Sequence, residues 1–336
     1  MAVKLTRAGG VLAALFAASC AGTAPPGVES PPALSVVAPA LVTPVEDSYP
    51  PAGARPQDPV KAAVFDRINR DRRDAGLPAV AWDDGVSRVA DAFCANQIRE
   101  NTSGHYLTDG LPPYARTSFA GVFGMQFENS VTWKTSGSSF DDPAETLALE
   151  GHASMLAEKP PYDGHRRTIL DPDATHVGVG YALSRGDFRM AQEFLVRHLA
   201  WLRVERLSPT SSVVAVSGQP VAGRRLQFVT IAWEPVPREL TRAEANGRTS
   251  YSYPRIEEAL VGEGNVTLKV VGAATLDRIR FGRDREFTFR FDPDRAGLWT
   301  LTFHTSPLRE ESIVPGGVAT LWVSGAGRTA LPADSR

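Results

Sequence analysis

The period of the hydrophobic pattern changes near residue 205, and this change divides the folded part of the chain into two regions. From about residue 61 apolar residues recur every three or four positions, as at Val64, Phe65 and Ile68, which predicts helices. Beyond residue 205 short runs alternate apolar and polar residues, as in 226–233. The fold class is therefore α+β, with a layered α+β domain at 61–200 followed by an antiparallel β-sandwich domain at 205–330.

The first region combines helices with one hairpin. Asp83 or Asp84 is a plausible N-cap for a helix that follows Trp82. Residues 142–145 read as a capping box with proline at the first helical position. Two strand-like runs, 176–183 and 188–196, flank a short turn and predict a β-hairpin.

The second region has little helical periodicity. Clusters of Gly, Pro and Asp separate its strand-like segments, as expected for a sandwich of roughly 110–130 residues. The six segments are 212–216, 225–233, 266–271, 286–291, 298–303 and 318–323.

Residues 1–20 have the features of an export signal. Lys4 and Arg7 precede an apolar run at 11–18, which is too short to span a bilayer as a helix, and small residues lead into Cys20. This pattern resembles a bacterial lipoprotein signal, in which Cys20 is lipidated and becomes the mature N-terminus. The alternative is an ordinary secretory signal with Cys20 incidental. The chain is thus expected to be exported, and either attached to the bacterial envelope membrane by its N-terminal lipid or secreted.

Residues 21–60 form a proline-rich linker with ten prolines and no helical or strand period. Such a composition favours extended polyproline geometry, which suits a spacer between an anchor and a folded body. The formal net charge of −2 argues against a nucleic-acid partner, because such proteins usually carry a basic surplus.

Candidate chemistry lies in the first region, in four short segments that carry His105, Glu128, Glu158 and His165. Two imidazoles and two carboxylates could bind zinc or share protons around a bound water. The alternative is that each side chain is simply solvated, since no His-Glu-x-x-His helix arranges two ligands in advance. No Gly-x-Ser-x-Gly elbow is present to support a serine hydrolase. Cys94 is predicted to be a buried small hydrophobe on a helix.

Six motifs between residues 62 and 197 follow one another in the order and spacing of a known family. They lie at 65–77, 79–83, 90–95, 128–129, 165–170 and 178–194. With His105 before the Glu128-Asn129 pair, they resemble a CAP domain, the SCP-like fold of cysteine-rich secretory proteins, antigen 5 and pathogenesis-related proteins. Residues 105–116 are similar to a bacterial subgroup. The chain departs from the pattern at Phe127, where glycine is usual, and in lacking the disulfides of eukaryotic members. It also has Met155 three residues before Glu158, where many members have tryptophan.

The resemblance implies an α-β-α sandwich with a cleft that holds His105, Glu128, Glu158 and His165. Some family members bind a divalent metal there, so Zn²⁺ or another divalent cation is the cofactor to consider. Other members bind sterols or lipids elsewhere, and few have an established reaction.

Three functions follow as hypotheses. The first is an envelope-anchored module that binds an envelope or extracellular lipid, glycan or peptide through the cleft, the β-sandwich or both. The second is a zinc hydrolase in which Glu128 or Glu158 acts as general base toward a bound water. The third is a structural component of the envelope, in which the four residues only stabilise the cleft.

Overall fold

The structure is a computed structural model that describes residues 35–37, 54–206, 213–261, 268–269, 275–276, 279–282, 285–293, 295–310 and 312–324. The predicted signal at 1–20, with Cys20, and most of the predicted linker at 21–60 lie outside the described residues. None of the described helices is long and apolar enough to cross a membrane.

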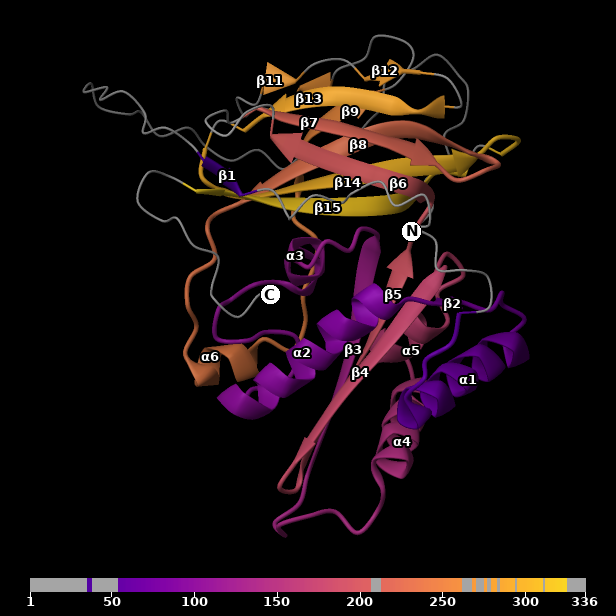
Figure 1. The fold of residues 1–336 in the computed structure, drawn as a ribbon, viewed down its shortest axis with the longest axis vertical. Coiled ribbons are helices and arrows are strands. Elements are labelled where there is room, and N and C mark those ends of the chain that lie inside the picture. The colour runs from indigo at the N-terminus through magenta and orange to yellow at the C-terminus, as the bar shows by residue number, and fades with distance from the viewer. Residues whose placement is uncertain are drawn as a thin grey trace, which may run out of the picture.

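The first domain is an α-β-α sandwich around a four-stranded sheet of order β2-β4-β5-β3 (Figure 1). The sheet contains β2 (Ala81–Trp82), β3 (Met125–Lys134), β4 (His176–Ser184) and β5 (Asp187–Val196). The helices are α1 (Pro59–Asp74), α2 (Asp84–Glu100), α3 (Pro113–Phe119), α4 (Ala144–Leu156) and α5 (Gly164–Ile169). Strands β4 and β5 form the predicted hairpin, and β3 is an edge strand.

Successive side chains of β4 point to opposite faces of the sheet, and helices cover both faces. Val177 and Val179 point to one face and pack into the core formed with α1 and α4. Gly178 and Gly180 point to the other face, where α2 lies. A Cβ added at Gly180 would lie 2.2 Å from the backbone nitrogen of Asp91, so only glycine allows α2 to approach this closely.

The second domain is an antiparallel β-sandwich. One sheet has the order β1-β15-β14-β8-β9-β10 and the other β11-β13-β7-β6, with β12 paired to β13. Side chains from both sheets, such as Phe289, Leu301 and Leu321, share one core. The strands are β1 (Ser35–Val37), β6 (Leu199–Arg206), β7 (Val214–Pro220), β8 (Arg224–Glu234), β9 (Ile256–Val261), β10 (Leu268–Lys269), β11 (Thr275–Leu276), β12 (Arg280–Phe281), β13 (Phe287–Asp292), β14 (Gly297–Pro307) and β15 (Val314–Ser324).

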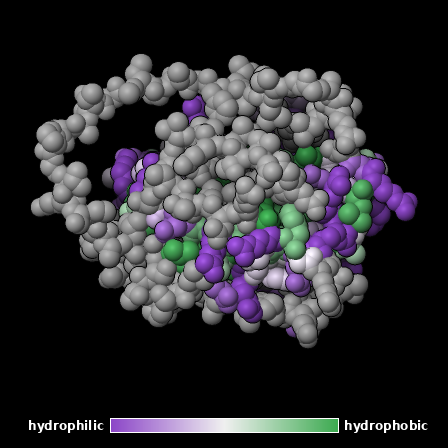
Figure 2. Space-filling model, turned by 90° about the horizontal axis from the view of Figure 1, so that it is seen from above, coloured by the Kyte–Doolittle hydropathy of each residue, from purple (hydrophilic) through white to green (hydrophobic). Residues whose placement is uncertain are grey.

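The two domains pack directly against each other through α3, which lies between the lower sheet and β15 in Figure 1. All seven residues of this short helix are buried. Tyr114 and Phe119 from the helix share a cluster with Leu298 and Trp322 of the sandwich. Seen from the sandwich end, the described surface is mostly hydrophilic, with hydrophobic side chains scattered among the polar ones (Figure 2).

Three local expectations differ from the structure. The capping box at 142–145 does not form, because Pro143 is itself the extended N-cap of α4 and makes no side-chain cap bond. Within the expected linker, β1 pairs with β15, because the edge of a sheet can accept even a short extended segment. A helix, α6 (Arg242–Gly247), lies inside the expected all-β region and is closed by a capping box between Thr241 and Glu244.

Candidate functional site

One part of the candidate site is a buried charge network on β3. His105 Nδ1 lies 2.8 Å from Glu128 Oε1, and Arg116 Nη2 lies 2.7 Å from Glu128 Oε2. The Glu128 side chain has no exposed surface, so both of its oxygens are used within the protein. The Arg116 guanidinium also stacks on Phe93, 4.0 Å from the ring centre.

Glu193 brings a second carboxyl group to this network. It pairs directly with Glu128 in the β3–β5 register, so both side chains emerge on the same face of the sheet. Burial, followed by the nearby charge of Glu128, raises the pKa of Glu193 well above its usual range. Burial also raises the pKa of Glu128, although Arg116 opposes that shift. With one guanidinium for two carboxyl groups, Glu193 is the group that keeps its proton.

His105 is held in its neutral form. Burial, assisted by the charge of Arg116, lowers the pKa of His105 to about 4. Because the Glu128 carboxylate can only accept, the Nδ1–H of neutral His105 donates to Glu128. The buried network therefore carries one ion pair and one neutral imidazole, beside the Glu193 carboxyl group with its raised pKa.

A segment of the second domain covers this network. We call residues 248–255, between α6 and β9, the strap. The Tyr251 hydroxyl accepts a hydrogen bond from the backbone N–H of Glu128 at 2.7 Å. Its ring stands edge-on to His105, with 5.0 Å between the ring centres. The Tyr253 hydroxyl bonds both backbone groups of Gln126, and its ring stacks on Tyr114 at 4.6 Å.

The other part of the site is a half-exposed pair, Glu158 and His165. His165 Nδ1 lies 2.5 Å from Glu158 Oε1, and the backbone N–H of His165 donates to Glu158 Oε2 at 2.9 Å. About a third of the His165 side chain is exposed, at 33%. Through these two hydrogen bonds, Glu158 holds the loop between α4 and α5 against the first turn of α5.

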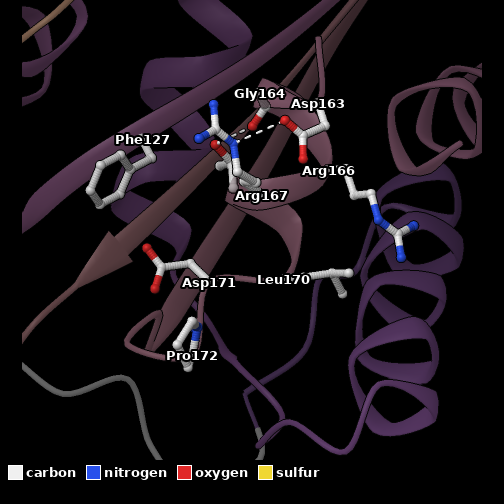
Figure 3. A pocket seen from close by; sticks show the side chains of 9 residues that line it. Phe127, Asp163, Gly164, Arg166, Arg167, Leu170, Asp171 and Pro172 are labelled. Carbon is white, nitrogen blue, oxygen red and sulfur yellow. Dashed lines mark hydrogen bonds and ion pairs between the residues drawn. The ribbon is translucent and has the colours of Figure 1, made fainter. Parts of the chain in front are cut away.

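An open cavity of about 530 Å³ lies along α5 (Figure 3). Phe127 of β3 and Leu170 provide apolar wall, while Asp163, Arg167 and Asp171 provide polar groups. Arg167 forms an ion pair with Asp163 at 3.2 Å, but 73% of its side chain remains exposed. The cavity thus offers one aromatic ring, a cation and carboxylates within reach of a ligand.

The four predicted site residues form two separate pairs. Successive residues of a strand point to opposite faces, so Glu128 faces the side of α2 and α3 while Asn129 faces α5. The Asn129 side-chain amide donates to the carbonyl oxygen of His165 at 3.1 Å, which places His165 on that second side. The two pairs thus approach β3 from opposite faces.

These donors do not fit a metal centre as they stand. Among the residues described, no three His, Cys, Asp or Glu side chains are grouped so that they could hold a metal ion. Arg116 already supplies the positive charge beside Glu128, and Tyr251 covers His105. The Zn²⁺ or other divalent cation suggested by the sequence stays a prediction, and so does a hydrolytic role for Glu128 or Glu158.

Cys94, considered in the sequence, and His152 of α4 are both enclosed by the protein. Cys94 is a free, fully buried thiol on α2, as predicted. His152 is also fully buried, between Asp71 at 2.9 Å and Gln192 at 3.0 Å. Both residues therefore stabilise the packing of a helix on the sheet.

Sequence reasoning missed Arg116, Glu193 and the two strap tyrosines. A signal existed for the first two, because each is a charged residue inside an otherwise apolar segment. No local signal marks Tyr251 or Tyr253, because their partners lie more than 120 residues earlier in the chain.

Comparison with known proteins agrees with this architecture. The family model described as "Cysteine-rich secretory protein family", CAP, matches residues 65–197. The uncharacterized protein YkwD of Bacillus subtilis is 29% identical over 121 residues, or 36% of this chain. The chain covers 42% of the length of that relative.

Solved structures with low sequence identity were also found. An outer surface protein of Borrelia burgdorferi is 16% identical, with a TM-score of 0.32, over 39% of this chain and 88% of its own. An extracellular SCP-domain protein of Bacillus anthracis is 22% identical, with a TM-score of 0.29, over 42% of this chain and 45% of its own. The family match and the bacterial relative establish that the chain contains a bacterial CAP-superfamily domain at residues 65–197.

Proposed function

We propose that this protein is an exported, envelope-anchored binding protein that takes an envelope or extracellular ligand in the open cavity along α5. The observation that carries the proposal is the contrast between the two parts of the site. The His105–Glu128 network is buried and internally compensated, whereas the 530 Å³ cavity is open and has polar groups with exposed surface. Relatives described as outer-surface and extracellular proteins support the expected location.

The cavity favours a ligand that combines a polar group with an apolar face. The Phe127 ring offers a surface for stacking or for aliphatic contact. Arg167 can exchange its partner Asp163 for a ligand group at little cost, because exposed ion pairs contribute about 0–1 kcal/mol. The Glu158–His165 pair holds the adjoining loop in place and is a positioning element in this proposal.

Reversing the charge of Arg167 is expected to weaken binding while leaving the fold intact. Full-length wild type and Arg167→Glu would be sedimented with purified peptidoglycan and with vesicles of envelope lipid. We expect one of these probes to retain the wild type, and the variant to bind it about tenfold less, a change of about 1.4 kcal/mol. Arg88→Glu, an equal charge change at an exposed position on α2, serves as the matched control. Equal binding by all three proteins, or none by the wild type, would contradict the proposal.

A structural role in the envelope is the second candidate, and the sealed network of His105, Arg116 and Glu128 favours it. Buried polar networks whose groups are all paired often rigidify a fold. Under this alternative, Arg167→Glu would bind both probes as the wild type does, and assembly of the envelope would depend on the presence of the whole chain.

The anchor is proposed from the sequence alone, and it has its own test. Replacing Cys20 by serine removes the thiol that would carry the lipid. We expect wild type to fractionate with membranes and Cys20→Ser to remain in the soluble exported fraction or to retain an uncleaved signal. A wild type found in the soluble exported fraction would show that Cys20 is incidental, and the protein would then be a secreted one.

A further inference from the structure

The outer edge of β3 presents backbone groups that an added strand could use. On its inner side β3 pairs with β5 along its whole length, from Met125 to Lys134. On the outer side, the N–H groups of Gln126 and Glu128 and the carbonyl of Gln126 receive side-chain partners. These groups have the two-residue spacing with which one strand recognises another.

The strap satisfies these groups with tyrosine hydroxyls. Tyr253 accepts from the N–H of Gln126 at 2.8 Å and donates to its carbonyl oxygen at 2.9 Å. This reproduces the pair of bonds that a residue of an antiparallel neighbour would make. The Tyr251 hydroxyl accepts a hydrogen bond from the N–H of Glu128 at 2.7 Å, which is the next N–H along β3 that points to the outer side.

Besides these two tyrosines, the strap contacts the first domain through Arg248, whose guanidinium lies 5.1 Å from the centre of the Tyr106 ring. Within the described part of the chain, no backbone–backbone hydrogen bond joins residues 249–255 to the first domain. Thr249, Ser250, Ser252 and Arg255 are exposed. The tyrosine rings, by contrast, fill apolar space beside Tyr114, Phe127 and His105.

We propose that the outer edge of β3 at Gln126–Glu128 is a docking site for an extended peptide with aromatic side chains, and that the strap is its resident occupant. A peptide backbone supplies the donors and acceptors that the edge requires, and aromatic side chains refill the space that the tyrosine rings leave. A partner of this kind must displace the strap, so the second domain limits access to this edge. The site adjoins the cavity along α5, because Phe127 lines that cavity and its ring also stands edge-on to Tyr253, with 6.5 Å between the ring centres.

The test uses the strap sequence itself as the probe. A fluorescein-labelled peptide with the sequence of residues 248–256 would be titrated into the full chain carrying Tyr251→Ala and Tyr253→Ala. We expect it to bind this variant at least tenfold more tightly than wild type, in which the edge is occupied. It should also slow hydrogen exchange at the Gln126 and Glu128 amides of the variant. Equal affinity for both proteins, or no binding to the folded variant, would overturn the proposal.

A milder pair of substitutions covers the case in which the alanine variant does not fold. Tyr251→Phe with Tyr253→Phe keeps the rings and removes only the hydroxyls, so exchange at Gln126 and Glu128 should accelerate at least tenfold in a folded protein. Unchanged exchange would also overturn the proposal. The Arg167→Glu test uses peptidoglycan and lipid vesicles as probes and this test uses the strap peptide, so the failure of one proposal is distinguishable from the failure of the other.

Discussion

Replacing Arg116 by methionine is expected to lower the free energy of unfolding by about 3–5 kcal/mol, because it leaves the fully buried Glu128 carboxylate without its cation. Methionine is shorter than arginine but keeps a flexible apolar side chain beside the Phe93 ring on which the guanidinium stacks. Urea unfolding of the full chain at neutral pH measures the change. A loss below about 1 kcal/mol would mean that Arg116 and Glu128 behave as a solvated pair.

A double-mutant cycle isolates the charge pair from the packing. Glu128→Gln alone removes the carboxylate that pairs with Arg116, but Glu193 of the same network can take its place as counter-ion, so a smaller destabilisation is expected. Combining it with Arg116→Met removes both charges, so the double variant should be more stable than the sum of the two single changes predicts. Additive effects would show that the two side chains contribute independently, contrary to their 2.7 Å contact.

Much of the overall architecture could be predicted from the sequence. The change of hydrophobic period indicates an α+β region followed by a β-sandwich, and the resemblance to the CAP family implies that the first region is an α-β-α sandwich. Gly178 and Gly180 belong to a motif of the family. The structure shows why glycine is needed at both positions, because α2 approaches the strand too closely for a side chain. The missed elements include β3 and α3 in the first domain and β6, β9 and α6 beyond it, and in such segments tertiary contacts decide the outcome.

The site was harder to predict, because its key contacts join distant parts of the chain. Four residues could be selected as chemically able, but their grouping depends on which face of β3 each one approaches. Glu128 is compensated by Arg116 of α3, a buried helix that packs on β15 of the second domain. The cover over His105 comes from Tyr251, which belongs to the second domain. A sequence pattern within one domain carries no information about such a cover.

The same junction between domains explains why we expect the fold to be sensitive to acid. His198, where β5 passes into β6, donates its backbone N–H to Gly316 at 2.7 Å and places Nδ1 3.2 Å from Thr305 Oγ1. Burial, with the charge of Arg224 and the neighbouring His176, lowers the pKa of His198 to about 3. Burial and the charge of Arg197 lower the pKa of His176 to about 4.

Acid should therefore destabilise the protein through these two histidines. Their folded pKa values lie below the value near 6.5 of an unfolded histidine, so their stabilisation is complete above pH 6.5 and is lost as pH falls toward 4 and 3. By linkage, the contribution of each histidine to the free energy of unfolding falls by about 2 kcal/mol by about pH 5. The raised pKa values of the Glu128 and Glu193 carboxyl groups act in the opposite direction, because they favour the folded state as pH falls.

A variant isolates the histidine contribution from that of the carboxyl groups. His198→Gln cannot take up a proton, so between about pH 7.5 and pH 5 it should lose about 2 kcal/mol less unfolding free energy than the wild type does. Urea unfolding at several pH values gives this difference, and the ring-proton resonances of His198 should titrate near pH 3 in the folded protein. Equal pH dependence of wild type and variant would show that His198 is solvated. The acid sensitivity would then have to come from other buried histidines, such as His176 and His105.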